Sequence, residues 1–308
     1  MLSTTLDERR RVADCHRQHS RICSIGRRPF HRLLLVAIAS IATGALTPLL
    51  PLQAQSAGRW LEVERLAGDV TVQMSPERPA QIGDRLSEPG HGLTTRQQSS
   101  AHLKLDYTIG TVAVAQNTRL LVQRLATLAD GARVTVLEVE SGQARIQARP
   151  FTNPNTVLEL HTPSGVAAVR GTEFGIAVTE AGKTSIGTLE GSVEATAESI
   201  TVDVDAGLAS IIRPGEPPTA PTPLDRQLDI TWLNQTRRGN RLFVSGRVDP
   251  TNSVFVGEEE ITVSPRGTFE WSGNQAVPNR SLIVTVKNPL GEARQHPLLT
   301  WQIRDLDP

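Results

Sequence analysis

The chain has 308 residues with a formal net charge of +0, 38% hydrophobic residues and 21% charged residues. This composition excludes a disordered chain and a polytopic membrane protein. The zero net charge argues against a dedicated nucleic-acid-binding protein, which needs a basic face to meet phosphates. The length predicts about two domains, at roughly 100–200 residues each.

Residues 1–57 are typical of an export segment. Arginines dominate residues 1–32, an apolar run extends from Leu33 to Leu52, and small residues follow in 53–57. These are the three parts of a secretory signal, so we expect a signal peptide or, if uncleaved, an N-terminal membrane anchor. Pro48 and Pro51 favour cleavage, because they interrupt a spanning helix. The segment 26–32, GRRPFHR, is similar to a twin-arginine export signal.

The two cysteines, Cys15 and Cys23, both precede the apolar run. The rest of the chain therefore has no disulfide, and burial of apolar groups must hold it together. Such a protein suits an oxidising compartment but does not require one. We expect a periplasmic or extracellular location, or less favourably the inner membrane, which the chain would contact only through residues 1–57.

Residues 61–212 are predicted to form a β domain. Short segments alternate between apolar and polar residues, and Gly-containing turns such as Asp130-Gly131, Ser141-Gly142 and Glu190-Gly191 separate them. Residues 119–130 are compatible with a short helix, although we favour a strand and a loop. The expected strands are 69–74, 100–107, 111–116, 133–140, 143–148, 156–162, 173–179 and 199–204.

The segment TPSGVAAVRGTEFGIAV (162–178), followed by TSIGTLEGSVEAT (184–196), resembles the FecR domain. Weaker similarity begins with the VERLAGDVTV block, and the resemblance extends over about residues 61–215. FecR domains occur in periplasmic regulators of iron-uptake signalling and in other exported proteins. The resemblance implies a FecR-like β-roll or sandwich and no catalytic role. The residues that carry it are Thr162, Pro163, Gly165, Arg170, Gly171, Thr172, Phe174, Glu190 and Gly191.

We interpret this motif as mainly structural. Pro163 ends a strand, since proline cannot donate to a ladder, and Gly165 and Gly171 permit turns or bulges. Arg170 and Glu173 can pair across the bend, which we interpret as a structural contact rather than a ligand clamp, and Glu190-Gly191 is expected to form a tight reversal. The residues expected to pack inward are Val166, Val169, Phe174, Ile176 and Val178.

Signalling members of the FecR family begin with a cytoplasmic segment that binds an extracytoplasmic-function sigma factor. Here about 30 arginine-rich residues precede the apolar run. A segment of this length is short for a packed domain. We therefore expect an exported, non-catalytic binding or scaffold protein of the cell envelope that contacts an unidentified protein or glycan. The alternative is a membrane-anchored FecR-type signalling component linked to such a sigma factor.

Residues 213–226 hold five prolines and are predicted to be an extended linker. Residues 227–305 contain about seven short alternating segments, which predict a smaller immunoglobulin-like β-sandwich. That part looks like the Ig-like domains appended to bacterial exported proteins. Its aromatic residues are mostly core candidates, and Trp271 and Trp301 are the candidates for stacking on a ligand at the surface.

The sequence contains no recognisable catalytic, cofactor or metal motif. The histidines show no metal-ligand spacing outside the N-terminal region, and no phosphate-binding loop or nucleophile elbow occurs. Asp203 and Asp205 alternate on one strand face, which we interpret as a solvated face. We expect no enzyme and no cofactor. A wall-degrading enzyme, the third alternative, would need two facing carboxylates in a cleft.

Overall fold

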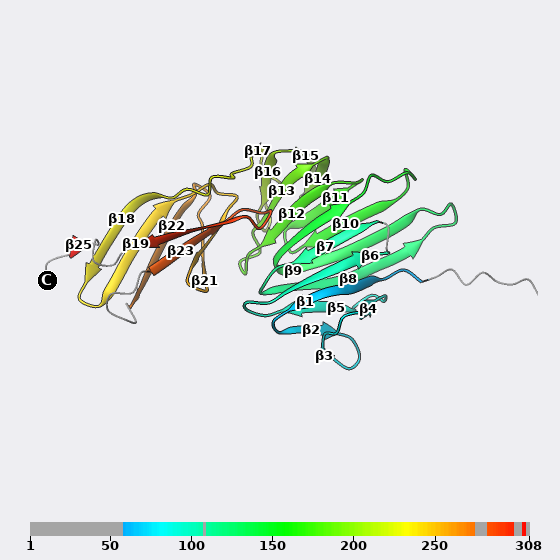
Figure 1. The fold of residues 1–308 in the computed structure, drawn as a ribbon. Helices are drawn as coiled ribbons and strands as arrows, with labels where there is room; N and C mark the ends of the chain where they lie inside the picture. Colours follow the sequence, from blue (N-terminus) through cyan, green and yellow to red (C-terminus); the bar gives the residue numbers. More distant parts are fainter. Residues whose placement is uncertain (1–57, 107–108, 275–281, 299–303, 306–308) are drawn as a thin grey trace, which may run out of the picture. The chain divides into compact units, whose positions relative to one another are not determined.

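Strands account for every regular element in the described part of the chain. The computed structural model describes residues 58–106, 109–274, 282–298 and 304–305 (Figure 1), so the predicted export segment 1–57 and Trp301 lie outside it. These residues form β-strands β1 to β25, which confirms the all-β prediction. Residues 119–130 form a strand and a turn instead of a short helix, because β8 extends over Thr118–Thr127. The same residues contain no helix long and apolar enough to cross a bilayer.

Strands β1 to β17 form a first lobe in which two sheets share one strand. Neighbouring strands pair antiparallel, except that β9 and β10 are parallel. The first sheet has the order β4 (Arg85–Leu86), β1 (Leu61–Ala67), β6 (Ser100–Leu105), β7 (Gly110–Val114), β9 (Arg133–Ala148), β12 (Glu173–Val178), β13 (Thr184–Glu190), β16 (Leu208–Ile212) and β17 (Thr222–Pro223). The second has β3 (Arg78–Pro79), β2 (Val70–Gln73), β5 (Gly92–Thr95), β8, β9, β10 (Val157–Thr162), β11 (Gly165–Val169), β14 (Ser192–Ala197) and β15 (Ile200–Asp205).

The shared strand β9 corrects one prediction. Two strands, 133–140 and 143–148, were expected on either side of a Ser141-Gly142 turn, but one continuous strand runs from Arg133 to Ala148. Its first part pairs with β8 and β10 in the second sheet, and its last part pairs with β7 and β12 in the first. Gly142 has a φ of +90°. This glycine bends the strand from one sheet into the other, so the Gly signal marked a bend and not a reversal.

The chain also crosses between the two sheets at other residues with positive φ. Gly171 (φ +110°) joins β11 of the second sheet to β12 of the first, and Gly191 (φ +80°) joins β13 of the first to β14 of the second. The predicted reversal at Glu190-Gly191 is therefore a change of sheet, because β14 pairs with β11 and β15 rather than with β13. Glycine suits these corners, since a Cβ disfavours positive φ.

The core of the first lobe lies between its two sheets. Strands of both sheets contribute to one buried cluster, which includes Leu103 and Ile146 from the first sheet and Leu120 and Leu160 from the second. Phe174 is the largest of these side chains and is fully buried. Burial of such a side chain stabilises the fold by roughly 1.5–3 kcal/mol.

Arg59 fastens the start of the first lobe to β8 and β9. Its guanidinium pairs with Asp106 (Nε to Oδ2, 2.6 Å) and donates to the carbonyl of Val134 (2.6 Å) and the hydroxyl of Thr135 (2.6 Å). Burial lowers the pKa of Arg59, and Asp106 opposes that effect. The charge is thus buried together with its partners, which limits its desolvation cost.

The second lobe contains two four-stranded sheets. One has the order β22 (Thr268–Asn274), β19 (Arg241–Arg247), β18 (Thr231–Arg238) and β25 (Arg304–Asp305), and the other β21 (Glu259–Ile261), β20 (Ser253–Val256), β23 (Leu282–Lys287) and β24 (Ala293–Leu298). A separate apolar cluster that includes Val244, Val254 and Phe269 fills this sandwich. Both lobes belong to one compact unit, residues 54–308.

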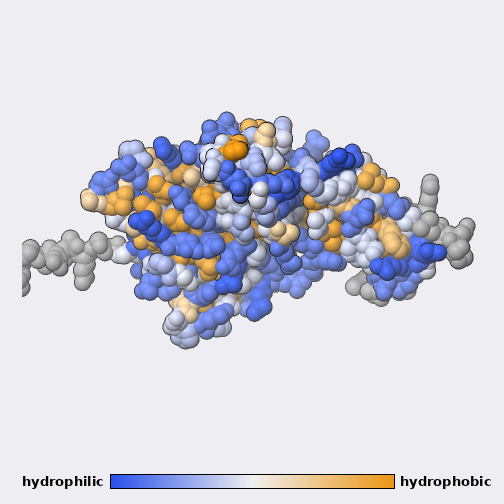
Figure 2. Space-filling model, turned by 180° about the vertical axis from the view of Figure 1, so that it is seen from behind, coloured by the Kyte–Doolittle hydropathy of each residue, from blue (hydrophilic) through white to orange (hydrophobic). Residues whose placement is uncertain are grey.

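The proline-rich segment 213–226 follows the edge of the first sheet. Its strand β17 pairs antiparallel with β16, and the amide of Thr219 donates to the carbonyl of Ile211 (2.9 Å). Leu224 is buried with Ala209 and Leu290 of the second lobe. Hydrophilic residues cover much of the face of the molecule in Figure 2, with apolar ones among them.

Candidate functional site

The motif residues Thr162 to Phe174 cover the end of β10, all of β11 and the start of β12. At the hairpin between β10 and β11, the Thr162 hydroxyl accepts from the amide of Gly165 (3.2 Å) and from the hydroxyl of Thr184 (2.9 Å). Pro163 lies in this turn, outside both ladders. The hairpin is therefore fixed by the motif's own side chains.

Gly171 and Gly191 meet at what we call the signature corner, formed by Gly171, Thr172, Glu190 and Gly191. A Cβ on Gly171 would lie 2.3 Å from Cα of Pro150, and one on Gly191 would lie 2.7 Å from Cγ2 of Thr172. Both distances are shorter than van der Waals contact. At Gly171 the clash is with backbone atoms, so only glycine fits there without moving the main chain, whereas at Gly191 the side chain of Thr172 would have to move. Both residues also have a positive φ, which favours glycine.

The pairing of Arg170 with Glu173 across the bend is not what the structure shows, because Glu173 pairs with Arg145. Oε1 of Glu173 accepts from Nε of Arg145 on β9 (2.9 Å), while the side chain of Arg170 is exposed. The reason is topological: β12 lies next to the last part of β9, so Glu173 faces this strand and not the preceding corner. The alternation of β11 corrects a second expectation. Val169 points into the core, whereas Val166 lies half-buried on the outer face.

Two open grooves flank the signature corner and share Gly171 and Thr172. One has a volume of about 460 Å³ and includes Glu159, Ala168, Arg170, Glu194 and Asp203, and the other has about 650 Å³ and includes Lys104, Arg149, Glu173 and Glu190. Thr172 is only 4% exposed, and its hydroxyl has no hydrogen-bond partner among the described residues. A buried polar atom without a partner is uncommon and marks this corner for attention.

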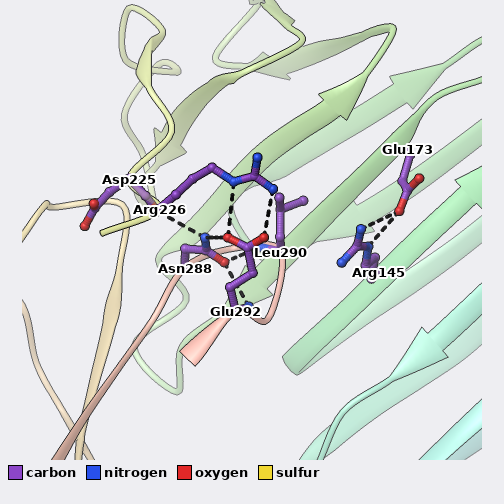
Figure 3. A network of polar contacts seen from close by, with 7 residues as sticks. All are labelled: Arg145, Glu173, Asp225, Arg226, Asn288, Leu290 and Glu292. Atoms are coloured by element: carbon purple, nitrogen blue, oxygen red, sulfur yellow. Dashed lines mark hydrogen bonds and ion pairs between the residues drawn. The ribbon is translucent and has the colours of Figure 1, made fainter. Parts of the chain in front are cut away.

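A second polar site connects the two lobes (Figure 3). The turn Asn288–Glu292 of the second lobe lies against β12, where a Cβ on Gly175 would come within 2.1 Å of the carbonyl oxygen of Pro289. Gln143 donates from Nε2 to the carbonyls of Asn288 (2.7 Å) and Pro289 (3.0 Å). We call this contact the interlobe seam.

Charged groups continue the interlobe seam towards the motif. Arg226 donates to Glu292 (Nη2 to Oε1, 2.9 Å), and this hydrogen bond lowers the pKa of Glu292. Arg145 also acts on Glu292 through its charge, while it pairs with Glu173 (Figure 3). Glu173 therefore belongs both to the motif and to the charge network that ends at the second lobe.

Lys183 is a buried charge at the same interface. It is 9% exposed, and its Nζ donates to the carbonyls of Pro250 (3.2 Å) and Asn252 (3.1 Å). Burial lowers the pKa of Lys183 to about 8, although the charge of Glu260 opposes the shift. Burial likewise raises the pKa of Glu260, against the effect of Lys183. The ammonium is thus held by polar groups of the second lobe.

The alternative of a wall-degrading enzyme would need two facing carboxylates in a cleft. A cleft of about 140 Å³ near Lys183 contains several carboxylates. Its lining includes the carboxylates Glu180, Glu258 and Glu260, together with Lys287. Glu260 accepts from the hydroxyl of Ser253 and the backbone amide of Glu180, in addition to its attraction to Lys183. This carboxylate is therefore engaged within the interface. The described residues also contain no group of His, Cys, Asp and Glu side chains arranged to hold a metal ion.

The surface aromatics were candidates for ligand stacking. Trp271 packs partly against the second core, and its Nε1 donates to Oε2 of Glu259 (2.9 Å). Trp232 contacts Phe269 edge-on, with 6.2 Å between ring centroids. Trp301 lies outside the described residues. A ligand-stacking role for either tryptophan stays a prediction.

Sequence reasoning missed Gly175, Gly187 and Lys183 as interface residues. A glycine inside a strand pattern indicates a close backbone approach, so the segments EFGIAV and TSIGTLE did contain a signal for the two glycines. A Cβ on Gly187 would lie 3.2 Å from Cβ of Pro289. No comparable signal exists for Lys183, because a single lysine in a turn normally lies in solvent.

The fold and the signature corner define an all-β protein whose first lobe is a two-sheet structure with glycine corners. Residues 92–194 match the family model described as FecR protein. The chain therefore carries a FecR domain, and the matched residues include β10 to β13 and the whole signature corner.

Solved structures resemble the chain only weakly. Two crystal structures of a protein from Parabacteroides distasonis ATCC 8503, whose description proposes it as an anti-sigma factor, share 15% and 16% identity with it, each with a TM-score of 0.32. They cover 41% of this chain, which spans about 60% of their length. The match to a polysaccharide lyase covers 81% of this chain and 40% of the lyase chain, at 8% identity and with a TM-score of 0.19. The comparison with curated proteins gives no match.

Proposed function

We propose that the chain is a non-catalytic, FecR-type signalling component of the cell envelope that binds a protein outside the cytoplasm. The observation that carries this proposal is the FecR match over residues 92–194. FecR-type signalling works through protein contacts, so the expected partners are an envelope protein and, on the other side of the membrane, a sigma factor. Fold alone is an associational argument, and the grooves at the signature corner supply a physical one.

The grooves favour a protein partner over a small molecule. Both grooves are open to solvent, and polar and apolar residues from separate strands line them in about equal measure. Small-molecule sites are instead enclosed and mainly apolar.

Residues 1–57 would determine on which side of the membrane each part acts. A relay to a sigma factor needs this segment to remain attached as an anchor. Mass spectrometry of the mature protein tests this directly. A retained N-terminal segment would support the relay, and a mature N-terminus near Gln55 would exclude it.

Deletion of the gene followed by transcript profiling tests the signalling role itself. The expected result is a change at a small set of promoters that share one recognition sequence, restored by the intact chain. An unchanged transcript profile together with altered envelope complexes would contradict signalling. That result would favour the second candidate, an exported scaffold, for which the tight interlobe seam at Gln143 and Asn288 is the supporting observation.

A further inference from the structure

The outer face of the second sheet carries an unusual arrangement of charges beside the signature corner. Strands β10, β11, β14 and β15 are consecutive neighbours, and one row across them contains Glu159, Ala168, Glu194 and Asp203. Glu194 and Asp203 are both exposed and lie directly opposite each other on paired strands. Asp205 lies on the same face, two residues further along β15.

This row costs stability. Like charges directly opposite each other on antiparallel strands are destabilising, by the same few tenths of a kcal/mol that an opposite pair contributes. The groove that includes Glu159, Glu194 and Asp203 has one cation in its lining, Arg170, and Glu159 is already paired with His161 (Nε2 to Oε2, 3.0 Å), so Glu194 and Asp203 are the carboxylates that carry the repulsion. Thr172, which also belongs to this lining, has a buried hydroxyl without a hydrogen-bond partner among the described residues. The fold alone gives no reason for either feature.

Apolar residues adjoin the acidic row. Val157, Val166 and Ala168 are half-buried on the outer face of β10 and β11, and Val136 lies opposite Glu159 on β9. The small side chain of Ala168 separates Glu159 from Glu194 and leaves a hollow between them. A partner can therefore bury an apolar group at Ala168 while its own charges meet the carboxylates.

We propose that this acidic face binds a basic segment of a partner protein, with lysine or arginine side chains on either side of an apolar one. The inference rests on the protein-binding role proposed above and adds the chemistry of the partner. A basic partner relieves the repulsion between Glu194 and Asp203, and complementary charge provides specificity and a faster association. The apolar anchor would provide the desolvated centre that protein interfaces have.

Titration of the full chain with a short amidated peptide of alternating lysine and valine tests the inference, at about 0.15 M salt to screen distant charges. The double variant Glu194→Gln, Asp203→Asn should bind on the order of ten-fold more weakly than the wild type. The matched control, Glu77→Gln with Glu270→Gln, removes the same charge from exposed positions elsewhere and should bind as the wild type does.

Stability provides a second measurement. Because the double variant removes a like-charge pair, its Tm should rise by about 1–2 °C, whereas a residue kept for stability would lower it. Equal binding by both double variants, or no binding at millimolar peptide, would overturn the inference. Either result would leave the signalling proposal standing, because transcript profiling tests that proposal independently.

Discussion

The buried ammonium of Lys183 predicts an unusual pH dependence of stability. Its pKa is lowered from the ordinary 10.5 to about 8 in the folded chain, mainly by burial. Between these two values the unfolded chain binds more protons than the folded one, so stability rises with pH. The contribution is fully present above pH 10.5 and is lost as the pH falls through about 8. Most folded proteins lose stability over this range.

The size of the effect follows from the two pKa values. A group with these values contributes about 2 kcal/mol more to the free energy of unfolding at about pH 9.5 than at pH 7. Such a difference is a large fraction of the stability of a typical domain. Burial also lowers the pKa of Lys287, so this lysine likewise makes the free energy of unfolding rise with pH. Variants at Lys183 are therefore needed to separate the two lysines.

Urea unfolding from pH 7 to pH 9.5 measures the effect in the wild type, Lys183→Met and Lys183→Arg. Methionine carries no charge, and arginine keeps its charge over the whole range. Both variants should therefore show about 2 kcal/mol less gain in stability than the wild type. Equal pH dependence in all three proteins would refute the assignment of a buried ammonium at this position. A fall in wild-type stability relative to both variants would do the same.

Three further predictions concern packing and backbone geometry. Arg59→Met removes the buried guanidinium and its hydrogen bonds to Asp106, Val134 and Thr135, and should lower the free energy of unfolding by about 2–4 kcal/mol in urea titrations. A change under about 1 kcal/mol would contradict the role of Arg59. Gly171→Ala places a Cβ at a positive φ and against the backbone of Pro150, whereas Gly131→Ala places one at a positive φ in open space. The first variant should therefore lower the free energy of unfolding by well over the roughly 1 kcal/mol expected of the second. Gly175→Ala should displace the turn at Pro289 and increase proteolysis between the lobes; unchanged cleavage would show that the seam tolerates the methyl group.

The sequence contained enough information for the all-β class and the FecR domain. Alternation predicted most strands, because a strand with one face in the core must alternate. It did not predict that β9 is continuous through Gly142, since a glycine that bends a strand and one that ends it look alike in sequence. Glu173 pairs with Arg145, 28 residues away in the chain, and such a partner follows only from the order of the strands.

The motif that identifies the domain contains two sets of residues with different tasks. Val169 and Phe174 are buried and, with Gly171, determine the path of the chain. Alternation along β11 places Val166 and Ala168 on the outer face, where the core imposes no demand. Substitutions on the outer face should therefore change stability by no more than about 0.5 kcal/mol. Partner specificity can then vary on this face while the fold stays constant, so a FecR match identifies the scaffold without identifying what it binds.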